Sequence, residues 1–294
     1  MAPPDAHLRR ASERRIERAI PDFATGAFLH AQARTELMRR LQPVQMSVQS
    51  ILDLGGGPGL GARALVRQFP KAAVTLVDRS PSMLRAAARA RGWWRKFECL
   101  EADATALPIA DGSVDLVVAS MLMPGLPHPE ILLTEVRRVL KPRGYFVFTT
   151  LGAPSLRELS TAFASADAEV PHLNDLIDFH DLGDALTRAG FVAPVLDTDR
   201  LTVTYWTLND ACRDLRAGAA PLPTTVRRSL TGRARWRAAE EAFSQGRGSD
   251  GRIPVTCELV YGQAWAPDVQ DVRRPGPTRE VVVPLTTQIG RAHV

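Results

Sequence analysis

The sequence has little cysteine and no long apolar run. Its three cysteines, Cys99, Cys212 and Cys257, are far apart and form no CxxC pair. A disulfide framework or a zinc site is therefore not expected, and a reducing compartment fits. No segment approaches the roughly 18 consecutive apolar residues that span a bilayer, and the N-terminal residues contain no apolar core of a secretory signal. These absences predict a cytoplasmic protein without a metal or a membrane segment.

Lysine is also scarce, so arginine supplies nearly all of the positive charge. Lysine occurs only at Lys71, Lys96 and Lys141, and the formal net charge of the 294 residues is +5. Acidic residues are interspersed among the arginines, so no block of one sign suggests an arm for DNA or RNA. The 45% apolar and 23% charged residues are typical of a folded globular chain. A nucleic-acid partner is not expected.

Short apolar strands alternate with helices over residues 48–150. The apolar pattern predicts strands at 50–54, 74–78, 97–101, 114–120 and 145–150, with helices at 62–69, 82–90 and 131–140. Residues 141–144 are expected to stop a helix and form a turn. Alternation of this kind indicates parallel βαβ units and therefore an α/β, doubly wound sheet.

The flanking segments have a different rhythm. Residues 1–47 predict a helical lead-in, with a helix within 21–47, and residues 48–267 are expected to form the main domain. Helices at 156–168 and 182–189 and strands at 192–197, 201–205 and 255–265 are predicted, with His180 and Asp181 as a turn and N-cap. Residues 268–294 have no clear periodicity and end in IGRAHV, which resembles a translated sequencing adapter, so a disordered or artefactual tail is expected.

A glycine cluster follows the first predicted strand. Gly55, Gly57 and Gly59 occupy alternate positions after Asp53. Glycine permits tight turns and close approach of a ligand to the backbone, and the amides at the start of the next helix can point at that ligand. The cluster could be a dinucleotide loop or a tight turn without a ligand. Asp78, nineteen residues after Gly59, could accept hydrogen bonds from both hydroxyls of a ribose. Such a role suits NAD and S-adenosylmethionine (SAM) equally.

The motifs of residues 50–150 resemble, as an ordered set, those of the class I SAM-dependent methyltransferases. The set comprises DLGGGPG, VDRSPSML, the acid of EADA, LP followed by DGSVD, and VLKPRG. The resemblance implies a Rossmann-like, seven-stranded, mostly parallel sheet whose last strand is antiparallel, with a helical lid. The lid would come from the N-terminus and from insertions near 154–175 and 207–248. SAM would be the cofactor, with S-adenosylhomocysteine as its product and no metal.

The resemblance also implies which residues surround the cofactor. They are Phe23, Asp53, Gly55, Gly57, Gly59, Asp78, Arg79, Met83, Asp103, Ala104 and Ser120. The loop glycines and Asp53 would lie beside the methionine part, Asp78 at the ribose and Ser120 near the sulfonium. Arg79 and Met83 would flank the adenine, and Asp103 with Ala104 would contact its edge. Met83 could equally be a core residue of its helix. Phe23 stands where the family usually carries tyrosine, so the lid would keep its packing and lose a hydroxyl.

The second half resembles the BioC-type malonyl-[acyl-carrier protein] O-methyltransferases of biotin synthesis. The matching segments are PSLRELSTAF, PHLNDLIDFHDLGDALTRAGF, LDTDRLTVTY and DGRIPVTCELVYGQAW. The resemblance implies methylation of the free carboxylate of a malonyl group carried by the phosphopantetheine of acyl-carrier protein. A carboxylate is already ionised at pH 7 and needs no general base, so no catalytic residue is assigned and positioning would carry the reaction.

The substrate-side residues have two interpretations each. The resemblance implies that Arg213 pairs with the carboxylate, with His172 and Asn174 as further contacts, although Arg213 could be a solvated helix residue and His172 could fasten a lid. A basic run around Trp236 could steer an acidic carrier protein or be a solvated helix face; its arginines are Arg227, Arg228, Arg233, Arg235 and Arg237. The enzyme is expected to be a monomer.

The loop after Ser120 departs from the family. The family tends to have asparagine and then Gln-Trp, whereas this chain has Met121 followed by LMPGLP. Because this loop borders the acceptor site, three alternatives remain open. They are a related arginine hydroxylase-like assembly factor for respiratory complex I, a methyltransferase for another small molecule, and a SAM-binding protein without catalysis.

Overall fold

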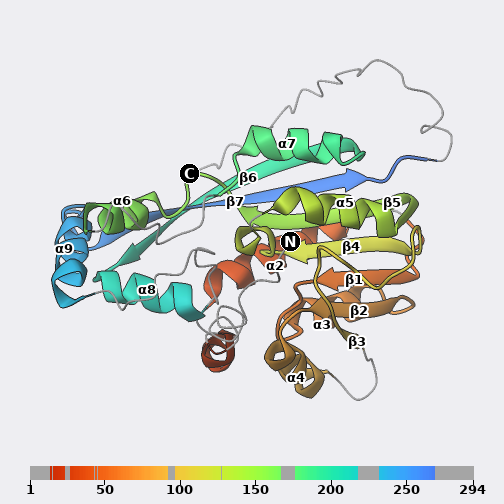
Figure 1. The fold of residues 1–294 in the computed structure, drawn as a ribbon, viewed down its shortest axis with the longest axis horizontal. Coiled ribbons are helices and arrows are strands. Elements are labelled where there is room, and N and C mark those ends of the chain that lie inside the picture. The colour runs from red at the N-terminus through yellow and green to blue at the C-terminus, as the bar shows by residue number, and fades with distance from the viewer. Residues whose placement is uncertain are drawn as a thin grey trace, which may run out of the picture.

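The structure is a computed structural model that describes residues 14, 16–23, 27–42, 44, 46–91, 97–126, 128–166, 176–217 and 232–268. A seven-stranded sheet in the order β3-β2-β1-β4-β5-β7-β6 forms its centre (Figure 1). The strands are β1 (Ser50–Leu54), β2 (Ala73–Asp78), β3 (Glu98–Glu101), β4 (Val114–Ser120), β5 (Leu140–Leu151), β6 (Val192–Tyr205) and β7 (Ile253–Trp265). β1 to β5 are parallel, and β7 is antiparallel to both neighbours. The predicted fold class is confirmed.

Helices cover both faces of the sheet. They are α2 (Phe28–Leu41), α3 (Leu60–Gln68), α4 (Pro81–Ala90), α5 (Pro129–Val139), α6 (Arg157–Ala166), α7 (Phe179–Arg188), α8 (Leu208–Ala217) and α9 (Arg233–Ser244), with a 3-10 turn, η1 (Met123–Gly125). Alternate residues of each strand point to opposite faces, so Phe146 packs with α5 and α7 whereas Tyr145 packs with α2 and α3. The two apolar faces make the fold doubly wound.

The β6–β7 ribbon extends beyond the rest of the sheet. Pairing of β5 with β7 ends at Leu151 and Leu259, whereas β6 and β7 stay paired as far as Tyr205 and Ile253. Helices α6, α8 and α9 pack around this free end and enclose a separate apolar cluster that includes Phe243 (Figure 1). α6 falls within the first predicted insertion, and α8 and α9 fall within the second. Among the described residues, no helix is both long and apolar enough to cross a membrane.

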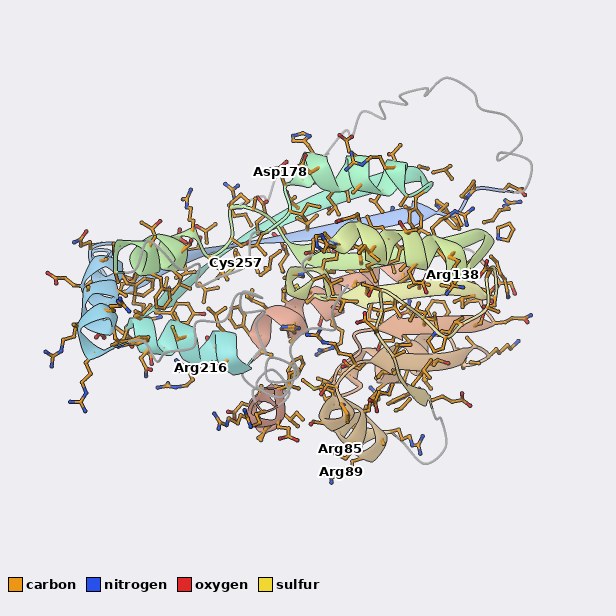
Figure 2. All side chains as sticks on the ribbon, in the orientation of Figure 1. Arg85, Arg89, Arg138, Asp178, Arg216 and Cys257 are labelled. Carbon is orange, nitrogen blue, oxygen red and sulfur yellow. The ribbon has the colours of Figure 1, made fainter. Side chains whose placement is uncertain are left out.

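The structure corrects three local predictions. Residues 192–205 form one strand rather than two. The N-cap of α7 is Asp178, at the start of the helix (Figure 2). Its carboxylate accepts from the His180 amide at 2.9 Å, so His180 and Asp181 lie inside the helix. Asp178 caps the helix because its extended backbone places the carboxylate over the first free amides. Residues 141–144 lie within β5 as a bulge, since the register passes from Leu140 opposite Val114 to Tyr145 opposite Leu116.

Candidate active site

The glycine loop joins β1 to α3 in a left-handed backbone. Gly55, Gly57 and Gly59 have φ angles of 65°, 53° and 83°. A Cβ at Gly59 would lie 2.8 Å from Cζ of Phe97, so only glycine allows this close packing. A Cβ at Gly57 would meet nothing nearer than the Met83 Sδ at 3.9 Å. One side of the loop is therefore packed tightly, and the space beside Gly57 can receive a ligand.

Asp78 fixes the loop from the end of β2. Its Oδ2 accepts from the Gly57 amide at 3.0 Å, and its Oδ1 accepts from the Ser80 amide at 2.9 Å. Each carboxylate oxygen can accept more than one hydrogen bond, so these backbone bonds are compatible with hydroxyl donors from a ribose. Asp78 is thus positioned by one amide of the glycine loop and one amide of the α4 N-cap.

Asp53 lies beneath the glycine loop. It is only 2% exposed, and a Cβ at Gly61 would lie 2.9 Å from its Oδ2. Burial raises the pKa of Asp53 to about 7; the Ala62 amide opposes that rise, the charge of Asp78 adds to it, and Arg34 opposes it. Oδ2 has no hydrogen-bond partner among the described residues. A buried carboxyl with an unmatched oxygen is costly, and a ligand group could satisfy it.

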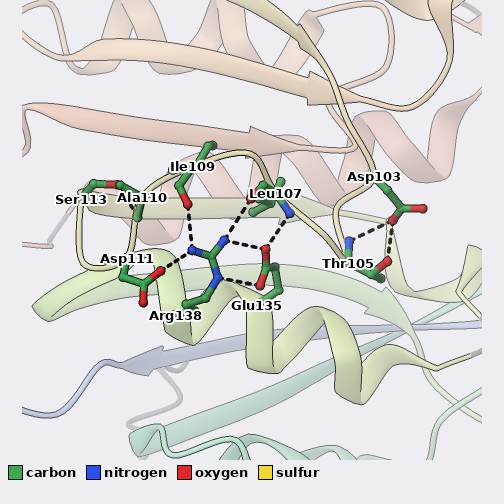
Figure 3. Close-up of polar contacts among 9 residues, drawn as sticks. All are labelled: Asp103, Thr105, Leu107, Ile109, Ala110, Asp111, Ser113, Glu135 and Arg138. Atoms are coloured by element: carbon green, nitrogen blue, oxygen red, sulfur yellow. Dashed lines mark hydrogen bonds and ion pairs between the residues drawn. The ribbon is translucent and has the colours of Figure 1, made fainter.

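The segment after β3 carries Asp103 and Ala104. Oδ1 of Asp103 accepts from the amide and the hydroxyl of Thr105, at 2.9 Å and 2.6 Å (Figure 3). These bonds close a tight turn at the carboxyl end of β3. The parallel neighbour β2 ends beside it at Asp78, since Asp78 is in register with Glu101. The two predicted acidic residues therefore lie at the same edge of the sheet.

Helix α5 anchors the rest of this segment. Glu135 accepts from the Leu107 amide at 2.6 Å, and Arg138 donates to the carbonyls of Leu107 and Ile109 at 3.0 Å and 2.8 Å (Figure 3). Arg138 also pairs with Glu135 and Asp111, and the hydrogen bonds that it donates to these two carboxylates raise its pKa. The network fixes the path of the chain behind Asp103.

The N-terminal helical residues lie against α4. Glu17 accepts from the Ser82 hydroxyl at 3.0 Å and pairs with Arg85 at 3.4 Å. Phe23, in the same helical stretch, has its ring 5.0 Å from that of His30. The contacts of Glu17 place the predicted lid segment beside α4, the helix that follows Asp78.

Arg79 and Met83 differ in exposure at the start of α4. Arg79 is exposed, whereas Met83 is 5% exposed and donates its amide to the Ser80 hydroxyl oxygen at 3.3 Å. Met83 packs as a core residue, and it also lies nearest to the open side of Gly57. Both interpretations of Met83 given above fit this position.

An apolar wall follows β4. The Ser120 and Thr149 hydroxyl oxygens are 3.3 Å apart, and the Met121 amide donates to the Thr149 carbonyl at 2.9 Å. Met121 has a φ of 57°, which is strained for a side chain of this size. Leu122 lies over the glycine loop, since a Cβ at Gly55 would be 2.8 Å from its Cδ1. The side chains next to Ser120 are therefore apolar.

Of the three predicted substrate residues, the structure describes Arg213. Arg213, on α8, has a side chain that is 68% exposed and lies 3.2 Å from Asp210 on the same helix. Arg233, Arg235 and Arg237 are exposed on α9, and Trp236 packs its ring 6.3 Å from that of Phe163 on α6. The remaining predicted residues lie outside the described part of the chain: His172, Asn174, Arg227 and Arg228.

Two residues at this edge were not predicted from the sequence. Leu122 lies over Gly55. Arg34 of α2 is half-buried, and the charge of Asp53 opposes the lowering of its pKa by burial. The available signal for Arg34 was its place between Ala33 and Leu37, which both belong to the apolar face of α2. Within the described ranges, no group of three or more His, Cys, Asp or Glu side chains could hold a metal ion.

Comparisons with known proteins agree with this geometry. A family model described as a methyltransferase domain matches residues 52–148. The YcgJ protein of Bacillus subtilis covers 81% of this chain and 99% of its own at a TM-score of 0.58 and 16% identity. The phosphoethanolamine N-methyltransferase 2 of Haemonchus contortus, solved with SAM, covers 80% of this chain and 52% of its own at a TM-score of 0.52 and 16% identity. These two structures share the fold.

The sequence is more similar to curated proteins named malonyl-[acyl-carrier protein] O-methyltransferase than to these two solved structures. The malonyl-[acyl-carrier protein] O-methyltransferase of Laribacter hongkongensis is 38% identical over 91% of this chain and 92% of its own length. The protein of the same name from Legionella pneumophila is 34% identical over 83% of this chain and 86% of its own. With this identity across nearly the whole length, the chain belongs to the malonyl-[acyl-carrier protein] O-methyltransferase family and is a SAM-dependent methyltransferase.

Proposed function

We propose that this enzyme methylates the free carboxylate of malonyl-[acyl-carrier protein] in the cytoplasm, at the start of the pimeloyl part of biotin synthesis. The observation that carries the proposal is the 38% identity to a relative of that name over nearly the full length of both chains. The geometry at the carboxyl edge of the sheet supports it, because the loop, the acidic residues and the apolar wall suit both reactants.

The residues present fit SAM. The space beside Gly57 admits a ligand close to the backbone, and Asp53 offers a buried oxygen without a partner. Asp78 would accept from the ribose hydroxyls, and Asp103 with Ala104 would contact the adenine edge. When bound, SAM supplies a methyl group on a positively charged sulfur, which a carboxylate oxygen can take in one displacement without a proton transfer.

The chain would contribute by positioning and by excluding water. Met121 and Leu122 place apolar side chains next to Ser120 and Gly55, so an acceptor carboxylate there would lose part of its hydration shell and gain reactivity. Arg213 would orient that carboxylate through a charge-assisted pair. To do so it would exchange its partner Asp210, which is 3.2 Å away on the same exposed helix surface.

The proposed partner is acyl-carrier protein, which is acidic and presents the malonyl group on a phosphopantetheine arm. Three exposed arginines, Arg233, Arg235 and Arg237, lie at the N-terminal end of α9, where the first turn contains no acidic residue. Basic side chains there add to the positive end of the helix dipole, which favours approach of an acidic protein. We propose that the enzyme acts as a monomer in this encounter.

The decisive experiment is a mass spectrum of malonyl-[acyl-carrier protein] after incubation with SAM and the purified enzyme. We expect a gain equal to one methylene unit, lost again on mild ester hydrolysis. Acetyl-[acyl-carrier protein], which has no free carboxylate, serves as the control and should not change. No gain on the malonyl form, with S-adenosylhomocysteine still bound in calorimetry, would refute this acceptor and leave the methyltransferase assignment intact.

A further inference from the structure

We propose that Ser120 donates a hydrogen bond to the acceptor carboxylate, and that Thr149 positions Ser120 by fixing the direction of its hydroxyl hydrogen. The inference rests on the proposed function, because it takes a free carboxylate as the acceptor. It deepens that function by assigning a donor at the reacting end of the acceptor. Three groups carry it: the Met121 amide, the Thr149 hydroxyl and the Ser120 hydroxyl.

Ser120 lies where the order of the strands reverses. β2 and β3 lie beyond β1 on one side of the sheet, and β5 lies beyond β4 on the other. Ligands of such sheets bind at the carboxyl ends of the strands at this reversal. Leu54 of β1 is paired with Ala119 of β4, so the residues that follow, Gly55 and Ser120, lie at the same edge. The predicted cofactor residues belong mainly to the ends of β1, β2 and β3, which leaves the β4 side for the acceptor.

Thr149 of β5 is paired with Ser120 and is fully buried. The two residues are in register, and their hydroxyl oxygens are 3.3 Å apart. Thr149 is 0% exposed, so its hydroxyl does not bond to bulk solvent. A buried hydroxyl that fails to donate is costly. Its hydrogen therefore points at an acceptor within the protein.

The Met121 amide decides which acceptor that is. A backbone N–H only donates, and this one donates to the Thr149 hydroxyl oxygen at 3.1 Å and to the Thr149 carbonyl at 2.9 Å. The Thr149 hydroxyl accepts in this bond and keeps one hydrogen of its own. Among the described residues, the Ser120 hydroxyl is its only other partner. Thr149 therefore donates to Ser120.

The Ser120 hydroxyl then has its own hydrogen left to donate. No further hydrogen-bond partner of this hydroxyl lies in the part of the chain that the structure describes. Ser120 is half-buried and is followed by the apolar Met121 and Leu122, so an anion beside it would lose water and gain this one donor. A carboxylate oxygen accepts such a bond, whereas a cationic group does not. The acceptor carboxylate matches this donor.

The bond would contribute mainly to binding of the acceptor. As the bond from the carboxylate oxygen to the methyl carbon forms and the bond from that carbon to sulfur breaks, the products become a neutral ester and a neutral thioether. The carboxylate therefore loses charge on the way to the transition state, and a hydrogen bond to it is strongest before reaction. Removal of such a bond raises KM and leaves kcat nearly unchanged.

Steady-state kinetics with malonyl-[acyl-carrier protein] and SAM test the proposal. Ser120→Ala should raise KM for the acceptor by about ten- to a hundredfold, the usual worth of a hydrogen bond to a charged group, with kcat nearly unchanged. Thr149→Val removes the hydroxyl at similar volume and should raise KM by less, about fivefold, whereas Thr149→Ser should restore it. Thr150→Val is the matched control, because Thr150 is equally buried and points to the opposite face of β5; KM should stay unchanged.

A double-mutant cycle separates positioning from a structural role. If Thr149 acts through Ser120, Thr149→Val has no further effect on KM in the Ser120→Ala background, since the hydroxyl that it orients is absent. Equal effects of Thr149→Val in both backgrounds would overturn the positioning role. The Met121 amide keeps its bond to the Thr149 carbonyl in these variants, so the turn after β4 should persist. If Thr149→Val nevertheless lowers the melting temperature strongly, the comparison of Thr149→Ser with the wild type decides.

The affinity for S-adenosylhomocysteine, measured by calorimetry, identifies the anion that Ser120 binds. We expect it to stay unchanged in Ser120→Ala; a loss without a rise in KM for the acceptor would place the hydroxyl on the cofactor carboxylate and overturn the proposal. An active wild type with an equally active Ser120→Ala would overturn this inference alone. A wild type that leaves malonyl-[acyl-carrier protein] unmodified would refute the proposed function, and this inference with it.

Discussion

Asp53 makes the stability of the ligand-free enzyme depend on pH in an unusual direction. Most carboxylates stabilise a folded protein as pH rises, because their folded pKa is lowered. Burial instead raises the pKa of Asp53 from 3.8 to about 7. Between these values the unfolded chain ionises Asp53 while the folded chain keeps it protonated. Unfolding then releases a proton, so this residue's contribution to the free energy of unfolding falls as pH rises.

The magnitude follows from the size of the shift. Each pH unit between the two pKa values changes the free energy of unfolding by about 1.4 kcal/mol, so the full window is worth about 4 kcal/mol. Below about pH 4 both states are protonated, and above about pH 7 both are ionised, so the effect is confined to that interval. Asp53→Asn has no group to titrate and lacks the effect.

Urea denaturation at pH 5, 6, 7 and 8 measures the difference in the free energy of unfolding between the wild type and Asp53→Asn. We expect the wild type to lose stability relative to the variant up to about pH 7 and the difference then to level off. Parallel pH profiles for the two proteins would refute a raised pKa. Repeating the series with saturating S-adenosylhomocysteine should flatten the difference, because its ammonium would favour the ionised carboxylate in the folded state.

Three further predictions concern the ribose, the acceptor and the segment behind Asp103. Asp78→Ala should lower the calorimetric affinity for S-adenosylhomocysteine and for 5′-methylthioadenosine by about a hundredfold each, because both ligands contain the ribose. Unchanged affinity would exclude Asp78 from binding the ribose hydroxyls. Arg213→Ala should raise KM for malonyl-[acyl-carrier protein] about tenfold with unchanged S-adenosylhomocysteine affinity. Arg216→Ala, at an exposed residue of the same helix, should leave KM unchanged. An equal rise of KM in both variants would show that Arg213 acts only as part of a solvated helix surface. Arg138→Met should lower the free energy of unfolding, measured in urea, by about 2 kcal/mol. The variant removes hydrogen bonds and ion pairs to Leu107, Ile109, Asp111 and Glu135. An unchanged free energy of unfolding would show that this network does not stabilise the fold.

The sheet and the glycine loop could be predicted because their signals are local. β1 and β4 coincide with the predicted residues 50–54 and 114–120, since a buried parallel strand is a continuous apolar run in the sequence. Gly55, Gly57 and Gly59 have left-handed backbone conformations that favour glycine whatever packs around them. Asp178 escaped prediction as the N-cap because two other polar residues follow it and each could serve.

The sequence by itself therefore determined the fold class, the loop and the acidic residues at the ends of β2 and β3. Only the tertiary structure decided that Asp53 is buried with an unmatched oxygen, and that the charge of Arg34, nineteen positions earlier and on another element, opposes the rise of its pKa. Periodicity reports which face of a helix is apolar, but desolvation and charge pairing depend on what packs against that face. Tertiary packing likewise made the β6–β7 ribbon continue past β5, because helices α6, α8 and α9 bury its free end.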